Sequence, residues 1–374
     1  MSPESTPVFV GIDLHSKTAR VAVLRGWDRD FYDERTLPAD VVKIRRYLQR
    51  LGKHGEVRAC YEASGSGYVL QRALAKAGIS CVVVAPSLIA RKPGERRKTD
   101  RIDACKLARQ LRNGDLVAVR IPTQAEESVR ELVRCRQSVR SEIHRSRQHI
   151  LKLLARRDVH RPQGRAWTVA FWQWLRKLEL PGPDQMALRT YLQLLDMKLL
   201  YLAELDAELE RLAQQPEYRE RVARLRCLRG IDTLTAMVLV TEIGDVQRFA
   251  SARQLMSYVG LAVAESSSGE TSRRFGLTKT GSARCRHVLV EAAWHYLRQP
   301  NRSRGLLDRQ KGQPAEVIAH AWRAQHRLHK RFKRLEMRMP RPKAAAAVAR
   351  ELVGFVWALL HDDPRVLEPA ACRR

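Results

Sequence analysis

The segment VFVGIDLHSKTARVAVL, residues 8–24, decides the fold of the N-terminal region. Two apolar runs flank a short polar turn, and this pattern predicts a β-hairpin. Asp13 follows the apolar run VFVGI directly, and a carboxylate there is costly to bury unless it is paired or binds a metal ion. We therefore expect a sheet that begins with two antiparallel strands and carries a functional carboxylate at a strand end.

The sequence that follows alternates strands and helices. EVRACYE at residues 56–62 predicts a strand that ends on a carboxylate, and a helical pattern runs from Gly65 to a glycine stop at Gly78. ISCVVVAP, residues 79–86, predicts a strand buried on both faces. A further helix is expected from about Thr99 to Arg112. This order predicts an α/β domain over residues 1–120.

Residues 121–223 have the heptad pattern of long helices. Apolar positions repeat every seven residues after Val129, with polar breaks at Arg136 and Ser146, and a second such stretch runs from Tyr191 to Leu212. Two long helices are expected, paired either with each other or with those of a second protomer. Residues 224–374 contain short helical segments separated by glycines, a serine-rich loop, a basic stretch and an Ala-rich helix. They predict a mainly helical C-terminal domain.

The charge balance points to a polyanionic partner. The 374 residues include 69 Lys and Arg against 40 Asp and Glu, a formal charge of +29. Nucleic acid is favoured over an acidic membrane surface, because no apolar run reaches the roughly 20 residues of a membrane span. The first residues lack the pattern of a secretory signal, and the seven cysteines form no CxxC pair. We expect a cytoplasmic protein without disulfide bonds, zinc or membrane contacts.

Four carboxylates form a candidate metal site: Asp13, Glu62, Asp100 and Asp103. Asp13 and Glu62 end predicted strands, and Asp100 and Asp103 share one face of a predicted helix. Oxygen ligands suit Mg²⁺, and two such ions support phosphodiester chemistry. Taken singly, each residue is also typical of a turn or a solvated helix face. The apolar run before Asp13 and the cations before Asp100, among them Arg97 and Lys98, favour the metal site.

Four segments carry a family resemblance: VGIDLHSKTARVAV, CYEASGSGYVLQRAL, VVVAPSLIARKPGERRKTDRIDACKLARQL and SSGETSRRFGLTKTGSARCRHVLVEAAW. They resemble consecutive motifs of the DEDD transposases of bacterial insertion sequences, a group that includes Piv-type DNA invertases and bridge-RNA-guided recombinases. The resemblance covers nearly the whole chain in the right order. It implies a bacterial transposase that cuts and rejoins DNA.

The resemblance also implies an architecture and partners. The N-terminal domain would be a RuvC-like RNase H fold whose acidic tetrad is Asp13, Glu62, Asp100 and Asp103, with Mg²⁺ as cofactor. Residues 121–223 would be a coiled-coil dimerisation region, and residues 224–374 the C-terminal transposase domain. The implied partners are donor and target DNA, a guide (bridge) RNA encoded beside the gene, and further copies of the chain in a dimer or tetramer.

The serine-rich loop ESSSGETSRRFGLTKTG begins at Glu265. From its residues alone it is a phosphate-binding or merely solvated loop. In the family it resembles, a serine directly before a glycine is the nucleophile, which corresponds to Ser268, with Ser267 as the alternative. Six basic residues near the two predicted sites are candidate nucleic-acid contacts: Lys17, Arg97, Lys98, Arg273, Arg274 and Lys279.

Two other functions fit parts of the sequence. A RuvC-like nuclease that hydrolyses branched DNA would need the four carboxylates but not Ser268. A basic RNA or DNA scaffold without enzymatic activity would need neither. Replacing Ser268 by alanine distinguishes the transposase from the nuclease, and replacing Asp13 by asparagine distinguishes both enzymes from the scaffold.

Overall fold

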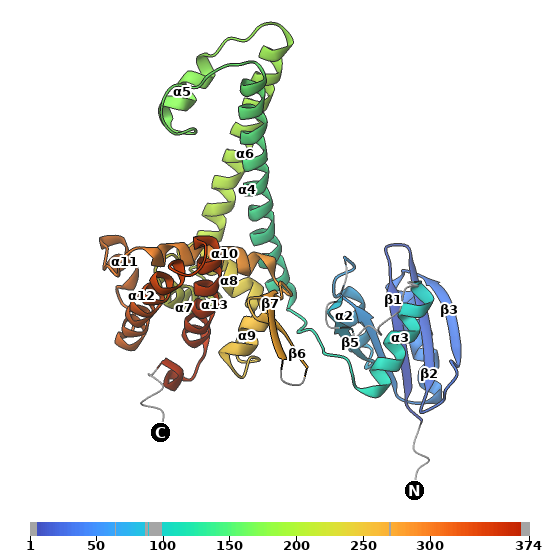
Figure 1. Ribbon diagram of the computed structural model, residues 1–374. Helices are drawn as coiled ribbons and strands as arrows, with labels where there is room; N and C mark the ends of the chain where they lie inside the picture. Colours follow the sequence, from blue (N-terminus) through green and yellow to red (C-terminus); the bar gives the residue numbers. More distant parts are fainter. Residues whose placement is uncertain (1–5, 64, 87–88, 90–98, 269–270, 368–374) are drawn as a thin grey trace. The chain divides into compact units, whose positions relative to one another are not determined.

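The computed structural model describes residues 6–63, 65–86, 89, 99–268 and 271–367 (Figure 1). The chain divides into two compact units, Met1–Pro122 and Thr123–Arg374. This division places the predicted middle and C-terminal regions in one unit, and the finer boundary at residue 223 stays a prediction.

The first unit is built on a mixed five-stranded sheet with the strand order β3-β2-β1-β4-β5. Its strands are β1 Val8–Leu14, β2 Thr18–Arg25, β3 Asp33–Pro38, β4 Val57–Glu62 and β5 Ser80–Val84. β1 pairs antiparallel with β2 and parallel with β4. β3 is antiparallel to β2, and β5 is parallel to β4. β1 is the central strand of the sheet, and Asp13 follows its buried residues. Asp13 therefore lies near the middle of the row of strand ends on one side of the sheet.

Helices cover both faces of this sheet. They are α1 Val41–Leu51, the short 3₁₀ turn η1 Gly52–His54, α2 Val69–Lys76 and α3 Asp100–Asn113. Val10 and Ile12 of β1 pack on one face with Leu48 of α1 and Leu74 of α2. The opposite face packs against α3. The predicted strands and helices of this region are confirmed, whereas β3 and α1 were not predicted.

In the second unit, two long helices lie side by side (Figure 1). They are α4 Gln124–Arg156 and α6 Pro183–Leu212, and the short α5 Val169–Lys177 lies between them in the sequence. Ile143 and Ile150 of α4 share one apolar cluster with Leu188 and Leu195 of α6. The heptad stretches therefore pair with each other within one chain.

The two polar breaks in the heptad pattern find partners on α6. Arg136, which is 8% exposed, donates from Nε to the carboxylate of Asp206. Ser146 is buried as well, and Lys198 Nζ donates to its hydroxyl at 2.9 Å. Because buried polar groups are costly unless they are hydrogen-bonded, these contacts favour this one pairing of α4 with α6.

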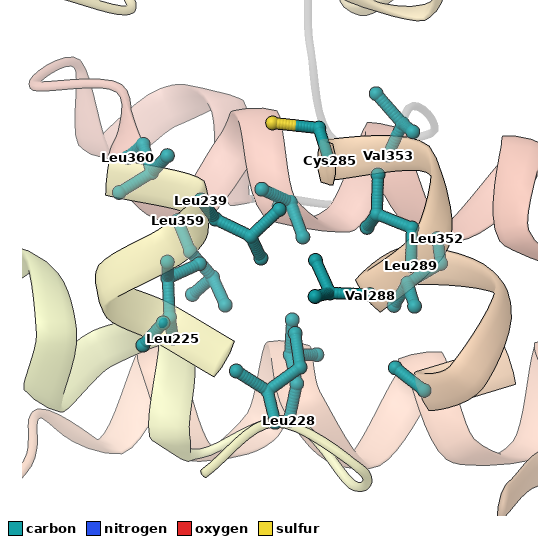
Figure 2. Close-up of a cluster of buried hydrophobic side chains, with 14 of the residues drawn as sticks. Leu225, Leu228, Leu239, Cys285, Val288, Leu289, Leu352, Val353, Leu359 and Leu360 are labelled. Atoms are coloured by element: carbon teal, nitrogen blue, oxygen red, sulfur yellow. The ribbon is translucent and has the colours of Figure 1, made fainter. Parts of the chain in front are cut away.

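The rest of the second unit is a helical core with one hairpin. Its elements are α7 Pro216–Arg226, α8 Thr233–Ile243, α9 Ala252–Tyr258, β6 Val263–Ser268, β7 Thr271–Leu277, α10 Ala283–Trp294, η3 His295–Leu297, α11 Arg304–Gln310, α12 Ala315–Glu336, α13 Arg341–Leu360 and η4 Pro364–Leu367. Figure 2 shows Leu225, Leu239, Val288 and Leu352, from α7, α8, α10 and α13, meeting in this core. Within the described part of the chain, no helix is long and apolar enough to span a membrane.

The serine-rich segment differs from its prediction as a loop. It forms the antiparallel strands β6 and β7, with Ser267 opposite Ser272 and Ser268 opposite Thr271. β-Branched and aromatic residues such as Val263, Thr271 and Phe275 favour extended backbone. The two strands pair through backbone hydrogen bonds, which do not require the apolar alternation by which a strand is recognised in a sequence.

Candidate functional site

Asp13 and Glu62 lie at the same end of neighbouring parallel strands. The register pairs Ile12 with Tyr61, so the next residues, Asp13 and Glu62, follow side by side. Cys60 faces α3, because its thiol donates to the carbonyl oxygen of Leu107 at 3.5 Å. Side chains alternate along a strand, which puts Glu62 on the face that α3 covers.

Gly11 fixes how closely α3 approaches this face. A Cβ atom at Gly11 would overlap the carbonyl oxygen of Ala104 and the backbone nitrogen of Ala108. Gly11 thus faces α3, and Asp13, two residues further along β1, lies on the same face. Only glycine allows the backbone of β1 and the first turns of α3 to come this close.

The N-terminus of α3 supplies the remaining two carboxylates. Thr99 caps the helix by accepting a hydrogen bond from the Ile102 backbone amide at 3.3 Å. Asp100 is the first residue of the helix, and Asp103 lies one turn further on. Negative side chains are favourable in the first helical turn, which presents unpaired amide groups. The capping residue therefore determines where Asp100 is presented to the sheet.

Asp13, His15 and Asp100 form the tightest cluster. One ligand atom of each lies within 4.8 Å of the others. His15 Nε2 is 3.2 Å from Asp13 Oδ2 and 3.4 Å from Asp100 Oδ1. Glu62 and Asp103 lie outside this group, although Asp103 is close enough to act on Asp13 electrostatically. The metal site predicted from the sequence did not include His15, whereas the structure places His15 between two of its carboxylates.

The environment of Asp13 favours a cation. Burial raises the pKa of the Asp13 carboxyl, and the negative charges of Asp100 and Asp103 raise it further, while His15 lowers it. The Asp13 side chain is 14% exposed, so solvent screens this repulsion only in part. Carboxylate oxygens and a histidine nitrogen are ligands of divalent cations. The residues present therefore fit a divalent metal ion.

The hairpin of β6 and β7 holds the candidate nucleophile. Ser268 is the last residue of β6. The side chains of residues 266–274, including those of Arg273 and Arg274, lie outside the described part of the structure. Lys279 follows the hairpin, is exposed, and adopts a positive φ of 55°. Its backbone amide donates to the carbonyl of Gly260 at 3.1 Å, which joins the two ends of the hairpin.

Two glycines and a buried carboxylate anchor the base of this hairpin. A Cβ atom on Gly260 would overlap the Thr280 carbonyl oxygen, and one on Gly281 would overlap that of Tyr258. Glu242 of α8, 5% exposed, accepts a hydrogen bond from Arg134 Nε at 2.9 Å and one from the Ser282 hydroxyl at 3.2 Å. Glu242 thus fixes Ser282, which begins α10 just after the hairpin, to the helical core.

The other predicted contacts are placed only in part. Lys17 is exposed between β1 and β2, on the unit that carries the carboxylates. Arg97 and Lys98 lie outside the described residues. Sequence reasoning did not single out the basic residues of α12 and α13 that line a hollow beside the hairpin. The basic run of residues 329–343 was the available signal.

Comparison with known proteins agrees over most of the chain. Residues 10–157 match the DEDD transposase domain of IS110 elements, and residues 222–307 match the profile described as "Transposase IS116/IS110/IS902 family". The chain is 38% identical to the Sinorhizobium fredii protein y4qE, which is named as a transposase, over 95% of this chain and 88% of that protein. It is 32% identical to the transposase for insertion sequence element IS1533 of Leptospira borgpetersenii, over 88% of this chain and 96% of the relative. Because the matches span both units, the chain belongs to the IS116/IS110/IS902 family of DNA transposases.

Proposed function

We propose that this transposase cuts and rejoins DNA strands with a metal-binding carboxylate site and a serine nucleophile. The observation that carries the proposal is the convergence of two strand ends, those of β1 and β4, with the capped N-terminus of α3. That arrangement, in a sheet of order β3-β2-β1-β4-β5, supports a RuvC-like RNase H fold.

Asp13, Glu62, Asp100 and Asp103 would hold Mg²⁺, with His15 in contact with Asp13 and Asp100. Bound Mg²⁺ would supply charge neutralisation at a phosphodiester and lower the cost of developing negative charge on oxygen. The residues' own task is to orient the cation and the phosphate. Asp13 is the residue best suited to it, because it is the more buried of the two carboxylates that His15 contacts and the backbone of β1 fixes its position.

Ser268 would act as the nucleophile, with Ser267 as the alternative. The serine hydroxyl loses its proton to a base, its oxygen forms a bond to phosphorus, and the bond from phosphorus to one deoxyribose oxygen breaks. That oxygen takes up a proton and leaves as a hydroxyl. A DNA hydroxyl then attacks the phosphoserine and regenerates the serine. No external energy source is needed, because the number of phosphodiester bonds is conserved.

The partners would be donor and target DNA, a guide RNA and further copies of the chain. A charge of +29 suits polyanionic partners, with Lys17, Arg97, Lys98, Arg273, Arg274 and Lys279 as candidate backbone contacts. Assembly would use α6, whose outer side exposes Leu194, Met197 and Tyr201 by 44%, 50% and 47%. These residues are three and four apart, so they share one face of the helix.

A covalent-trapping assay tests this function. The protein is incubated with Mg²⁺, labelled donor and target DNA and RNA from the flanking region, and denaturation-resistant protein–DNA adducts are measured. We expect an adduct that is lost in Ser268→Ala and in Asp13→Asn. DNA cleavage that persists in Ser268→Ala, with no adduct in the wild type, would instead identify a hydrolytic nuclease.

A further inference from the structure

A hollow lies beside the hairpin of β6 and β7 in the second unit. It has a volume of about 1050 Å³, and its lining comes from α9, from both strands of the hairpin, and from α12 and α13. Val263 of β6 and Phe275 of β7 belong to this lining. The strands that carry Ser268 and its neighbours therefore form one wall of the hollow.

The lining is strongly basic. It contains seven Arg and Lys side chains and one carboxylate, Glu351. Arg327 forms an ion pair with Glu351, and Arg331 Nε lies 3.9 Å from the same carboxylate. The other five cations make no ion pair with any carboxylate of the described chain, and all five are exposed: Arg253, Lys330, Arg334, Lys343 and Arg350. One glutamate cannot neutralise this set, so the hollow attracts anions.

These cations line two walls. Lys330 and Arg334 are four residues apart on α12, and Lys343 and Arg350 are seven apart on α13, so each pair shares one helix face. Ala346 and Ala347, small side chains of α13, also line the hollow. A hollow lined by cations from two helices and by small side chains suits a backbone that carries a charge at every step.

Aromatic side chains accompany the cations. Phe275, 58% exposed, lines the hollow beside the hairpin. A second hollow of about 1310 Å³ shares Arg253, Arg327 and Lys330 with the first and adds three half-buried aromatic residues, Trp322, Phe355 and Trp357. The two hollows thus adjoin. Basic grooves with exposed aromatic side chains are typical of proteins that bind single-stranded nucleic acid, since phosphates bind the cations and bases stack on the rings.

We propose that the first hollow, which lies between α12, α13 and the hairpin, is a groove that binds a single nucleic-acid strand. The phosphates lie along Arg334, Lys343 and Arg350, and a base stacks on Phe275. If the strand is DNA, the groove leads it along the hairpin toward Ser268. That last step rests on the proposed serine chemistry, whereas the binding itself does not.

Binding without metal tests the groove separately from catalysis. The full-length protein is titrated with labelled oligo-dT, oligo-rU and a dA·dT duplex over a range of salt concentrations. The test variant is Arg334→Ala with Lys343→Ala and Arg350→Ala. The matched control is Arg46→Ala with Arg50→Ala and Lys53→Ala, which removes the same charge from an exposed region of the first unit. Thermal unfolding confirms that both variants are folded.

We expect the test variant to bind single strands at least tenfold more weakly. Its slope of log affinity against log salt should be shallower by about 2, because each lost phosphate contact of a single strand contributes roughly 0.7. Phe275→Ala should weaken binding about tenfold with an unchanged salt slope, since stacking releases no counterions. If the test variant loses affinity for oligo-dT, the groove binds a DNA strand. If it loses affinity for oligo-rU alone, the groove binds an RNA strand, and delivery of DNA to the serine is excluded.

Three results would contradict the proposal that the groove binds a single strand. They are an unchanged affinity of the test variant, an equal loss in the control, and a loss as large for the duplex as for the single strands. Ser268→Ala should bind like the wild type. If the Ser268→Ala variant binds normally but forms no trapped adduct, as we expect, strand binding does not depend on the serine chemistry. If wild type forms no adduct yet the groove variant loses binding, the serine mechanism fails while the groove stands.

Discussion

Gly11 of β1 lies directly against Ala104 of α3, where any side chain at residue 11 would overlap the Ala104 carbonyl oxygen. This contact sets the distance between the sheet and the helix that begins with Asp100. The position of Asp100 beside Asp13 therefore depends on a residue that has no chemistry of its own.

Gly11→Ala should destabilise the first unit and separate the carboxylates. Inserting a methyl group into a packed backbone contact typically costs about 1–3 kcal/mol of unfolding free energy. Urea unfolding measures the loss, and adduct formation should fall along with it. Gly52→Ala is the control, because its new Cβ would meet only Val57 Cγ2, at 4.0 Å, and φ is −60°. Equal stability of the two variants would contradict a close contact at Gly11.

Much of this first unit is predictable from sequence, and the exceptions have physical reasons. Apolar runs predict the hairpin of β1 and β2, but β3 reads DERTLP and is an edge strand, and three of its six side chains are exposed. An edge strand needs little apolar alternation, so composition does not reveal it. The helix α1 had a usable signal in Asp40, whose side chain accepts from the amides of Val42 and Lys43.

The site was predictable in its carboxylates but not in His15. Asp13 stands out because it follows a buried strand, whereas the contact of His15 with Asp100 depends on the approach of α3, which local sequence does not encode. The heptads likewise could not separate pairing within one chain from pairing between chains. In the structure Arg136 of α4 pairs with Asp206 of α6 in the same chain, 70 residues away in sequence.

Mg²⁺ should stabilise the first unit through Asp13. Free Mg²⁺ at a hundred times its dissociation constant should add about 2.7 kcal/mol to the free energy of unfolding. Calorimetry with and without Mg²⁺ measures this gain, which Asp13→Asn should remove. Asp115→Asn, a change at an exposed carboxylate of the same unit, should keep it. A gain that survives in Asp13→Asn would place the cation elsewhere.

Without metal, the same Asp13→Asn substitution should raise stability at neutral pH. The pKa of Asp13 is raised in the folded protein, chiefly by burial, so the folded state holds this proton more tightly than the unfolded chain does. Its stability contribution therefore falls as the pH rises from the ordinary aspartate pKa through the raised one, and the cost persists above it. Unfolding curves across this interval should show a steeper loss in the wild type than in the asparagine variant. Parallel curves would contradict the assignment.

The buried ion pair between α4 and α6 should be important for the stability of the second unit. Arg136→Ala leaves Asp206 without its partner, and breaking a buried pair costs about 3–5 kcal/mol. The lower end is expected, because the Asp206 side chain is 31% exposed. Arg145→Ala, which removes the exposed pair with Glu142, should cost less than about 1 kcal/mol. The loss should not depend on protein concentration, since both partners belong to one chain; a concentration-dependent loss would indicate exchange of helices between protomers.

Self-assembly should depend on the outer face of α6, because its inner face is already occupied by α4. Leu194→Glu with Tyr201→Glu places two charges on the exposed apolar stripe, and burying them in an interface would be strongly unfavourable. Light scattering should then report a monomer where the wild type forms a dimer or tetramer, while the helix content is unchanged. Ala203→Glu with Ala207→Glu adds the same charge at exposed alanines of the same helix and should leave the assembly intact. An oligomer that survives the first pair of substitutions would show that the copies meet through another surface, and the exposed stripe would then have no role in assembly.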